Sequence, residues 1–207
     1  MTTTRSEHWE RVYSNKEATE LSWYQPRSEV SLRLITQTGV QSNDPILDAG
    51  GGASTLVDNL QEQGFRDITV LDISATALER AKARMGDSAR TVHWVTADVT
   101  AFSPTRQYAL WHDRAVFHFL VEQHDRDRYL DALLATLRPR GHLVLATFGP
   151  DGPLRCSGLE ICRYSSEQLQ EIFDAHFELR HHELHDHVTP AGASQQFIYS
   201  WWQVRAR

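Results

Sequence analysis

Ile46-Leu47-Asp48-Ala49-Gly50-Gly51-Gly52-Ala53-Ser54 is the stretch of sequence on which the predicted fold depends. A short apolar run leads to an aspartate, three glycines follow, and a helix-compatible segment begins near Ser54. Glycine lacks a Cβ atom, so the backbone can turn sharply and a ligand can lie directly against its N–H groups. A strand, a glycine turn and a helix in this order are typical of the nucleotide-binding corner of a doubly wound α/β sheet.

Two further apolar strands lead to an aspartate at nearly equal spacing along the chain. The run Ile68-Thr69-Val70-Leu71 ends at Asp72, and Val92-His93-Trp94-Val95-Thr96 is followed by Asp98. A carboxylate in the position of Asp72 can accept hydrogen bonds from both ribose hydroxyls of an adenosine. The alternative for Asp48 and Asp72 is capping of the helix that follows, and Asp98 could simply begin a loop. Three acids at the tips of neighbouring parallel strands favour a nucleoside site.

This arrangement resembles the class I S-adenosylmethionine (SAM)-dependent methyltransferases over roughly residues 45–207. Asp48 would hold the methionine ammonium, and the resemblance implies that Asp72 holds the ribose and Asp98 lies at the adenine edge. Thr55 stands where a dinucleotide-binding fingerprint has its third glycine, which favours SAM over NAD. The predicted cofactor-binding residues are Trp23, Asp48, Gly50, Gly51, Gly52, Asp72, Ile73, Ala97, Asp98 and Val99.

Strands and helices alternate from residue 45 to the end of the chain. The predicted strands are 46–48, 68–71, 92–96, 108–113, 142–148, 177–187 and 195–204. Continuous apolar runs are typical of parallel strands that are covered on both faces, and the last two segments predict an antiparallel hairpin. With the resemblance, the prediction is an α/β fold with a doubly wound, mostly parallel, seven-stranded Rossmann-like sheet, a C-terminal antiparallel hairpin and an N-terminal helical annex. The annex spans residues 1–44, and the SAM-binding methyltransferase domain spans residues 45–207.

The annex is rich in aromatic side chains. Thr4 and Glu7 predict a capping box for its first helix, and Pro26 and Gly39 are placed to begin and end a second one. SAM carries a sulfonium cation, which an aromatic face stabilises when it is desolvated. The resemblance implies that such an annex folds over the cofactor, and Trp23 and Tyr24 are the predicted lid residues. Ordinary packing of these aromatic side chains against the core is the alternative.

Asp113-Arg114-Ala115-Val116-Phe117-His118 follows the fourth strand, where the family presents its acceptor. Methyl transfer is an in-line displacement, so positioning and desolvation contribute much of the rate. A hydroxyl acceptor needs a base such as His112 or His118, whereas a thiolate or other soft nucleophile needs little help. The predicted catalytic residues are Asp113 and His118, and the predicted substrate-binding residues are Tyr24, Arg114, Arg155 and Tyr164. A purely structural role for Asp113, Arg114 and His118 is the alternative.

Composition and missing motifs exclude several classes of function. The 207 residues carry a net charge of −6, which argues against a nucleic-acid partner because phosphates are repelled. Lysine occurs only at positions 16 and 82, so the Tyr-x-x-x-Lys pair of short-chain dehydrogenases is absent, and no P-loop motif occurs. Without a secretory signal, a membrane-spanning run or a cysteine framework, the sequence predicts a cytoplasmic protein without a membrane partner. It leaves the oligomeric state open.

The run from His181 to His187 could place four side chains on one strand face, but it leads toward a hairpin tip. We therefore predict no metal site. The predicted activity is SAM-dependent methyl transfer to a small-molecule acceptor, such as a thiol, a sulfide or another soft nucleophile. Similar single-domain enzymes act on thiopurines, halides or tellurite. Protein lysine methylation is the first alternative, and a non-catalytic nucleotide-binding scaffold is a more distant one.

Overall fold

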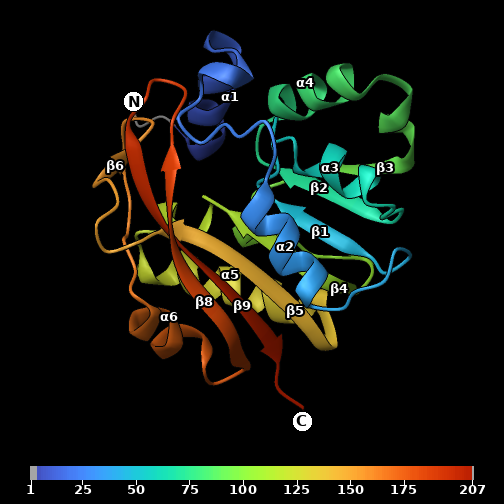
Figure 1. Cartoon of the computed structure of the whole chain (residues 1–207), viewed down its shortest axis with the longest axis vertical. Coiled ribbons are helices and arrows are strands. Elements are labelled where there is room, and N and C mark those ends of the chain that lie inside the picture. Colours follow the sequence, from blue (N-terminus) through green and yellow to red (C-terminus); the bar gives the residue numbers. More distant parts are fainter. Residues whose placement is uncertain (1–3, 207) are drawn as a thin grey trace.

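A seven-stranded sheet forms the centre of the molecule in the order β3-β2-β1-β4-β5-β9-β8 (Figure 1). The computed structural model describes residues 4–206, so residues 1–3 of the predicted annex and residue 207 lie outside it. The strands are β1 Ile46–Ala49, β2 Ile68–Asp72, β3 Val92–Thr96, β4 Tyr108–Arg114, β5 Leu137–Phe148, β8 Phe177–Val188 and β9 Ser194–Val204. Strands β1 to β5 pair in parallel, and β9 is antiparallel to both β5 and β8. The predicted sheet and its terminal hairpin are confirmed.

Helices cover both faces of the sheet, which explains the continuous apolar strands. The helices are α1 Arg5–Asn15, α2 Glu29–Gln37, α3 Leu56–Glu62, α4 Ala75–Met85, α5 Gln123–Thr136 and α6 Ser166–Phe173. One apolar cluster joins α2, α3 and α4 to the sheet, and a second joins α5 and α6 to its other face. In Figure 1, α2 lies in front of the sheet and α5 behind it. Every residue of β1 and β2 is buried as a result.

Short elements occupy the connections between these helices and strands. The 3₁₀ turns are η1 Ala18–Glu20, η2 Gly86–Thr91, η3 Val99–Ala101 and η4 Phe117–Phe119. A separate two-stranded ribbon, β6 Arg155–Cys156 with β7 Leu159–Glu160, lies in the loop between β5 and α6. No helix within residues 4–206 combines the length and the apolar content needed to cross a membrane.

The structure corrects two predicted boundaries. The second annex helix begins at Glu29 rather than at Pro26, and Ser28 precedes it in a non-helical conformation. Strand β5 begins at Leu137 rather than at His142, with an irregular register opposite Tyr108 and Leu110. Pro139 cannot continue the preceding helix but is compatible with extended backbone, so the chain leaves α5 directly into a strand.

The first annex helix docks against the start of α4, and the two lie side by side in Figure 1. The Glu10 carboxylate accepts hydrogen bonds from the backbone N–H groups of Ala75 (2.6 Å) and Thr76 (3.3 Å). A carboxylate at a helix N-terminus satisfies free N–H groups and interacts favourably with the helix dipole. The predicted capping box of α1 is present, with Thr4 and Glu7 exchanging hydrogen bonds. These contacts place α1 next to the carboxyl ends of β1 and β2.

Candidate active site

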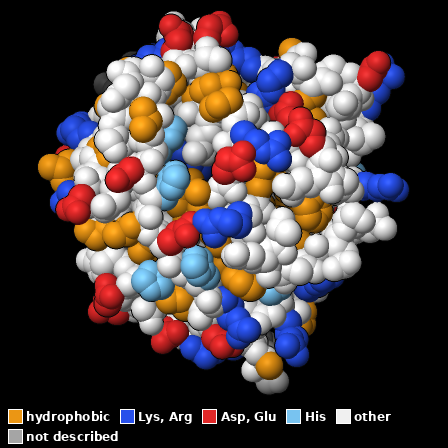
Figure 2. Space-filling model, in the orientation of Figure 1, with side chains coloured by type: hydrophobic (Ala, Val, Ile, Leu, Met, Phe, Trp, Pro, Cys, Tyr) orange, Lys and Arg blue, Asp and Glu red, His pale blue; other side chains and the backbone are white. Residues whose placement is uncertain are grey.

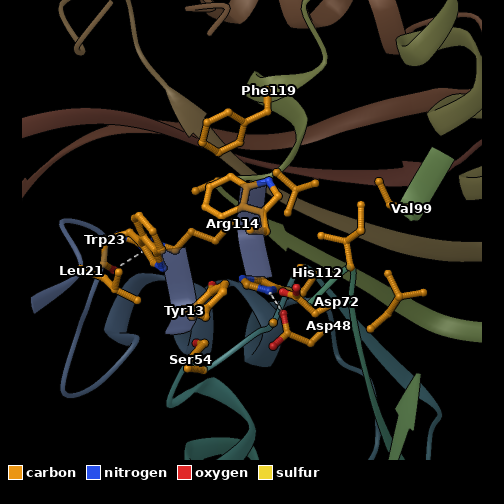
Figure 3. Close-up of a pocket in the computed structure, with 18 of the residues that line it drawn as sticks. Tyr13, Leu21, Trp23, Asp48, Ser54, Asp72, Val99, His112, Arg114 and Phe119 are labelled. Atoms are coloured by element: carbon orange, nitrogen blue, oxygen red, sulfur yellow. Dashed lines mark hydrogen bonds and ion pairs between the residues drawn. The ribbon is translucent and has the colours of Figure 1, made fainter. Parts of the chain in front are cut away.

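A cavity lies at the carboxyl ends of β1, β2 and β4, and the annex forms one of its walls (Figure 3). Residues from both sides of the sheet edge and from the annex line it. Nine of the ten predicted cofactor residues are among them: Trp23, Asp48, Gly50, Gly51, Asp72, Ile73, Ala97, Asp98 and Val99. The predicted substrate residues Tyr24 and Arg114 line the same cavity. The sequence-based predictions for this group therefore converge on one place, because parallel strands end at a common edge.

The glycine bend gives this cavity its floor. Gly50 and Gly52 have φ angles of +69° and +46°, a region that side chains with a Cβ rarely occupy. The Gly50 N–H donates to the Leu71 carbonyl (2.7 Å), which ties the bend to the end of β2. A Cβ on Gly52 would lie 2.7 Å from the Tyr13 hydroxyl and 2.8 Å from Asp72 Oδ2. Gly52 is absent from the cavity lining, and it provides the close approach between α1 and Asp72.

Asp48 belongs to a buried chain of three polar side chains. Its Oδ1 lies 2.7 Å from His112 Nδ1, and His112 Nε2 lies 2.9 Å from Ser31 Oγ. With a neutral His112, Nδ1–H donates to the carboxylate and the Ser31 hydroxyl donates to Nε2. Asp48 Oδ2 is buried and accepts no hydrogen bond from any group within residues 4–206. One carboxylate oxygen is thus fixed by His112, and the other is left for a ligand donor.

Asp72 ends β2 with a fully enclosed carboxylate. Its Oδ1 accepts a hydrogen bond from the Ser74 N–H (2.8 Å), so part of the alternative capping role is real. Burial, opposed by the Ser74 hydrogen bond and reinforced by the nearby charges of Asp48 and Glu10, raises the pKa of Asp72 to about 7. A buried acid that has a raised pKa and faces a cavity is typical of a functional site. The carboxylate needs hydroxyl or amide donors, which a ribose provides.

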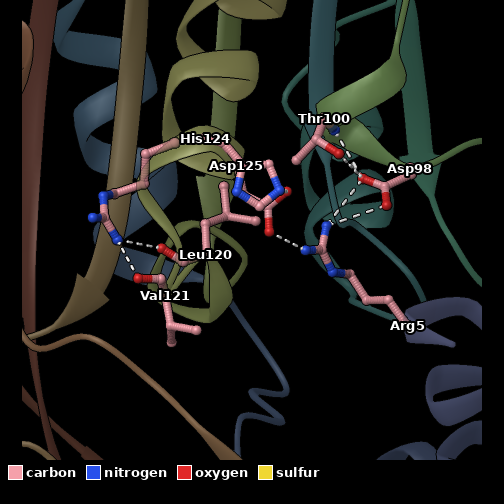
Figure 4. A network of polar contacts seen from close by, with 8 residues as sticks. Arg5, Asp98, Thr100, Leu120, Val121, His124 and Asp125 are labelled. Carbon is pink, nitrogen blue, oxygen red and sulfur yellow. Dashed lines mark hydrogen bonds and ion pairs between the residues drawn. The ribbon is translucent and has the colours of Figure 1, made fainter. Parts of the chain in front are cut away.

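Asp98 takes part in a network of polar contacts that the sequence did not reveal (Figure 4). Its Oδ1 accepts hydrogen bonds from the N–H (2.9 Å) and the hydroxyl (2.7 Å) of Thr100. The Arg5 guanidinium pairs with Asp98 (3.2 Å) and with Asp125 at the start of α5 (2.5 Å). Arg5 and Val99 both line the cavity. The network therefore holds α1 against this end of the cavity. The predicted adenine contact of Asp98 stays a prediction.

Aromatic side chains close the annex side of the cavity. The ring centroid of Trp9 lies 5.0 Å from that of Phe119 and 5.8 Å from that of Trp23, and the ring centroids of Tyr13 and Trp23 are 6.3 Å apart. All four side chains line the cavity, and Figure 3 shows Phe119, Trp23 and Tyr13 around one side of it. We call Trp9, Tyr13, Trp23 and Phe119 the aromatic wall. Edge-to-face pairs of this kind form a rigid apolar surface that stabilises a desolvated cation.

The predicted catalytic residues Asp113 and His118 lie outside the cavity lining. Asp113 is fully buried, and its carboxylate accepts hydrogen bonds from the Tyr129 hydroxyl (2.8 Å) and the Val116 N–H (3.0 Å). His118 is fully buried, and its ring stacks on Phe148 with centroids 4.4 Å apart. Burial, followed by the charge of Arg114, lowers the pKa of His118 to about 3. Their contacts are those of core residues that support the η4 turn, and neither side chain reaches the cavity.

Two predicted substrate residues also lie away from the cavity. Arg155 is an exposed residue of β6 and donates to the Gly158 carbonyl (2.6 Å), and Tyr164 is buried against Phe117 at a centroid distance of 5.4 Å. In their place the structure brings Cys156 and His112 to the lining, together with the side chains of Trp9 and Phe119. Cys156 is a buried free thiol. No motif singled out Cys156 or Phe119, because a loop and a 3₁₀ turn carry them to the cavity.

The histidine-rich strand β8 contributes to the surface instead. Figure 2 shows histidines among interspersed acidic and basic side chains on this face of the molecule. His187 Nε2 contacts the Ser22 carbonyl (2.8 Å), so the last histidine of the run packs against the annex. Within residues 4–206, no three or more His, Cys, Asp or Glu side chains converge in a way that could hold a metal ion.

Residues 46–141 match the family described as "Methyltransferase domain". The matched range contains the glycine bend, Asp72 and the whole of β4, and so the greater part of the cavity described above. The chain is a SAM-dependent methyltransferase, and its fold is that of the class I enzymes. SAM is its cofactor. Asp48 Oδ2 has no hydrogen-bond partner within residues 4–206, so it fits a ligand with an ammonium group, and the glycine bend fits a ligand that lies against the backbone.

Relatives of this methyltransferase differ in what they act on. The chain is 23% identical over 192 residues to EEF1A lysine methyltransferase 2 of Danio rerio, covering 84% of the chain and 75% of that protein. It is 32% identical over 114 residues to Nodulation protein S of Bradyrhizobium diazoefficiens (54% of the chain, 53% of that protein). It spans 13% and 22% of two further curated relatives.

A solved structure shares the fold of this methyltransferase. It is the Burkholderia thailandensis 1,6-didemethyltoxoflavin-N1-methyltransferase, with bound 1,6-didemethyltoxoflavin and S-adenosylhomocysteine. The TM-score is 0.68 at 21% identity, and the similarity covers 93% of this chain and 80% of that chain. The likeness extends through the annex and the hairpin, beyond the range of the family match.

His112 offers a test of how this methyltransferase holds Asp48. Replacement of His112 by phenylalanine keeps a flat ring but removes the hydrogen bond to Oδ1, so the carboxylate is free to rotate. We expect the affinity for S-adenosylhomocysteine to fall by about tenfold, the effect of losing one buried charge-assisted hydrogen bond. Titration calorimetry measures the change. Ser31→Ala serves as the matched control and should have a smaller effect, and unchanged affinity in His112→Phe would contradict a positioning role.

Proposed function

We propose that this methyltransferase transfers the methyl group to a small-molecule acceptor, with thiols, sulfides and other soft nucleophiles as the first class to test. The observation that supports this is the aromatic wall. The annex places Trp9, Tyr13 and Trp23 along one side of the cavity and so covers that side. A small, partly apolar acceptor fits beneath such a wall more readily than a protein segment does.

The groups that line the cavity also favour a soft nucleophile. Within residues 4–206, His112 is the one histidine that lines the cavity. One of its ring nitrogens contacts Asp48 and the other contacts Ser31. A hydroxyl acceptor would need a free base at the reacting atom, whereas a thiolate or an unprotonated amine needs only to be positioned. SAM supplies an electrophilic methyl group on a sulfonium centre. The chain's own contribution is then to bind, orient and desolvate the two partners.

We further propose that residues 1–44 act as an annex to the catalytic domain of residues 45–207 and cover the bound cofactor. Trp23 and Tyr24 remain the residues proposed for the lid, and both line the cavity. Asp48, Asp72 and the glycine bend are the groups proposed to hold SAM. The Arg5 network and the Glu10 cap would have to open, at least in part, for the cofactor to enter.

Protein lysine methylation is the second candidate. It is favoured by the description of the Danio rerio relative as a lysine methyltransferase and by the net charge of −6, which would attract a basic protein. A lysine acceptor would have to pass the aromatic wall in an extended conformation. It would also approach the cationic Arg114, which lines the same cavity.

Incubation with methyl-labelled SAM separates the two candidates. The purified protein is mixed with a panel of thiols, amines and phenols in one arm and with a cell extract depleted of small molecules in the other. We expect release of S-adenosylhomocysteine together with label in the small-molecule fraction. Label confined to protein bands would reject the small-molecule proposal, and Asp72→Ala serves as the inactive control in both arms.

A further inference from the structure

Arg114 is the last residue of β4, and its side chain is held by uncharged groups. Nε donates a hydrogen bond to the Tyr199 hydroxyl (2.9 Å), and Nη1 donates to the Trp23 carbonyl (2.8 Å). The guanidinium carbon lies 4.6 Å from the ring centroid of Phe197. A hydroxyl, a carbonyl and an aromatic face orient the group, but they do not neutralise its charge. The position of the guanidinium is therefore fixed before any ligand arrives.

The remaining nitrogen of Arg114 has no partner within residues 4–206. Nη2 is buried and finds no acceptor there, and no carboxylate in that range forms an ion pair with the guanidinium. Because an arginine stays charged, burial without an anion costs free energy unless a ligand supplies the counter-charge. Arg114 lines the cavity, so a ligand bound there would lie next to this side chain. Guanidinium groups bind carboxylates with short, charge-assisted hydrogen bonds.

The position of Arg114 in the sheet indicates which ligand carries the anion. Asp48 lies on β1, whereas Phe197 and Tyr199, which hold the guanidinium, lie on β9. Arg114 itself lies on β4, the neighbour of β1, but its side chain crosses β5 to reach β9, which is three strand steps from β1, roughly 14 Å at the usual strand spacing. In SAM, the ammonium and the carboxylate are attached to the same carbon atom. If Asp48 Oδ2 holds the ammonium, an anion beside Arg114 belongs to the acceptor.

We propose that Arg114 is the specificity-determining residue of the acceptor subsite and that the natural acceptor is a small nucleophile that bears a carboxylate. This inference rests on the proposed small-molecule function. The carboxylate binds at Nη2, and the flat or apolar body of the acceptor lies against the aromatic wall. The charge of Arg114 also disfavours a lysine ammonium at the same place, so one residue selects for one class of acceptor and against another.

Matched pairs of probes test this selectivity on the protein saturated with S-adenosylhomocysteine. The pairs are 2-mercaptobenzoate with thiophenol and 2-aminobenzoate with aniline, which differ only in the carboxylate. We expect the wild-type protein to bind each carboxylate at least about tenfold more tightly than its neutral partner, as measured by calorimetry. In Arg114→Met this preference should disappear. The affinity for S-adenosylhomocysteine should change by less than about threefold, because Asp48, Asp72 and the glycine bend are unchanged and, within the cofactor subsite, only the hydrogen bond to the Trp23 carbonyl is lost.

Two further variants complete the experiment. Arg114→Lys keeps the charge without the fork and should retain part of the preference, and it carries the test if Arg114→Met does not fold. Arg90→Met removes an exposed arginine of the η2 turn and should behave as the wild type. The same probes are then offered with SAM in place of the product, so that turnover is compared with binding.

Three results would overturn the inference. Equal binding of both members of each pair by the wild type excludes selection of a carboxylate, and so does a failure of the carboxylates to bind at all. A loss of about tenfold or more in affinity for S-adenosylhomocysteine in Arg114→Met, with the probe preference retained, would assign the anion to the cofactor. Failure of the proposed function has another signature, since it places the label in protein bands and in no probe.

Discussion

Asp72→Ala is expected to weaken the binding of S-adenosylhomocysteine by about a hundredfold, because the proposed role of this carboxylate is to accept hydrogen bonds from both ribose hydroxyls. Two charge-assisted hydrogen bonds in a buried site account for a loss of this order, about 3 kcal/mol. Asp72 is 5% exposed and stands at the end of a buried strand. Calorimetric titration of the purified variant measures the effect.

The pKa of Asp72 adds a pH dependence to this prediction. Burial raises that pKa to about 7 in the free protein, whereas the ribose hydroxyls require the ionised carboxylate. The affinity of the wild-type protein should therefore fall as the pH is lowered from 8 to 5.5, since a growing fraction of Asp72 must lose a proton before the ligand binds. Asp72→Asn should bind weakly at all pH values, with a flat profile.

Folding stability should respond in the opposite direction. A carboxyl group whose pKa is raised on folding contributes stability that is fully present below about pH 4 and is lost as the pH rises through about 7. Asp72→Asn removes this buried charge, so the free variant should be more stable than the wild type at pH 8, by an amount on the order of 2 kcal/mol. The difference should shrink toward pH 5. A variant that bound the ligand as tightly as the wild type, or that was less stable at pH 8, would contradict the assignment.

Gly51→Ala is the second substitution with a large expected effect. A Cβ at Gly51 would lie 2.5 Å from Asp48 Oδ2 and 2.7 Å from Val70 Cγ1. Val70 belongs to the buried strand β2, and His112 holds Asp48, so neither neighbour can move without disrupting its own contacts. The carboxylate that would bind the methionine ammonium is displaced. We expect a loss of about a hundredfold in affinity for S-adenosylhomocysteine and about 1–3 kcal/mol in stability.

Gly86→Ala provides the matched control for this substitution. Gly86 has a φ angle of +59° at the end of α4, and a Cβ there would meet no atom within 4 Å. The variant should lose about 1 kcal/mol of stability through backbone strain, as judged by thermal unfolding, while its affinity for S-adenosylhomocysteine stays that of the wild type. Comparable affinities in Gly51→Ala and Gly86→Ala would show that the glycine bend does not act through Asp48.

Much of the fold and of the cofactor side of the cavity could be read from the sequence for a local reason. The predicted strands at 46–48, 68–71, 108–113 and 142–148 are largely apolar runs, and the aspartates at 48, 72 and 98 each lie at or just past the end of a predicted strand. Because parallel strands end at one edge, the positions of these residues in the chain already imply their proximity in space. The class of fold follows from that pattern, and the resemblance carried by the same residues indicates the family and the cofactor.

The acceptor side depended on tertiary structure. His112 and Arg114 turn toward the cavity, whereas Asp113 between them turns into the core, where it meets Tyr129. Alternation along a strand predicts that neighbours face opposite ways, but not which face carries the cavity. That choice is made by the layers of helices on the two sides of the sheet. Asp113 lies outside the cavity for this reason, whereas His118 belongs to the η4 turn and stacks on Phe148.

The sequence by itself determined the parallel sheet, the glycine bend and the acids at its edge, because periodicity, chain order and the lack of a Cβ are properties of neighbouring residues. Only the tertiary structure decided that Ser31 and His112 hold Asp48 and that Arg5 joins Asp98 to Asp125. It also decided that the Arg114 side chain rests on β9, with Nη2 lacking a partner within residues 4–206. The contact between Asp48 and His112 joins residues 64 positions apart along the chain, and the contact between Arg5 and Asp125 joins residues 120 positions apart. Such pairs form only when burial and packing bring distant elements together, which no local pattern specifies.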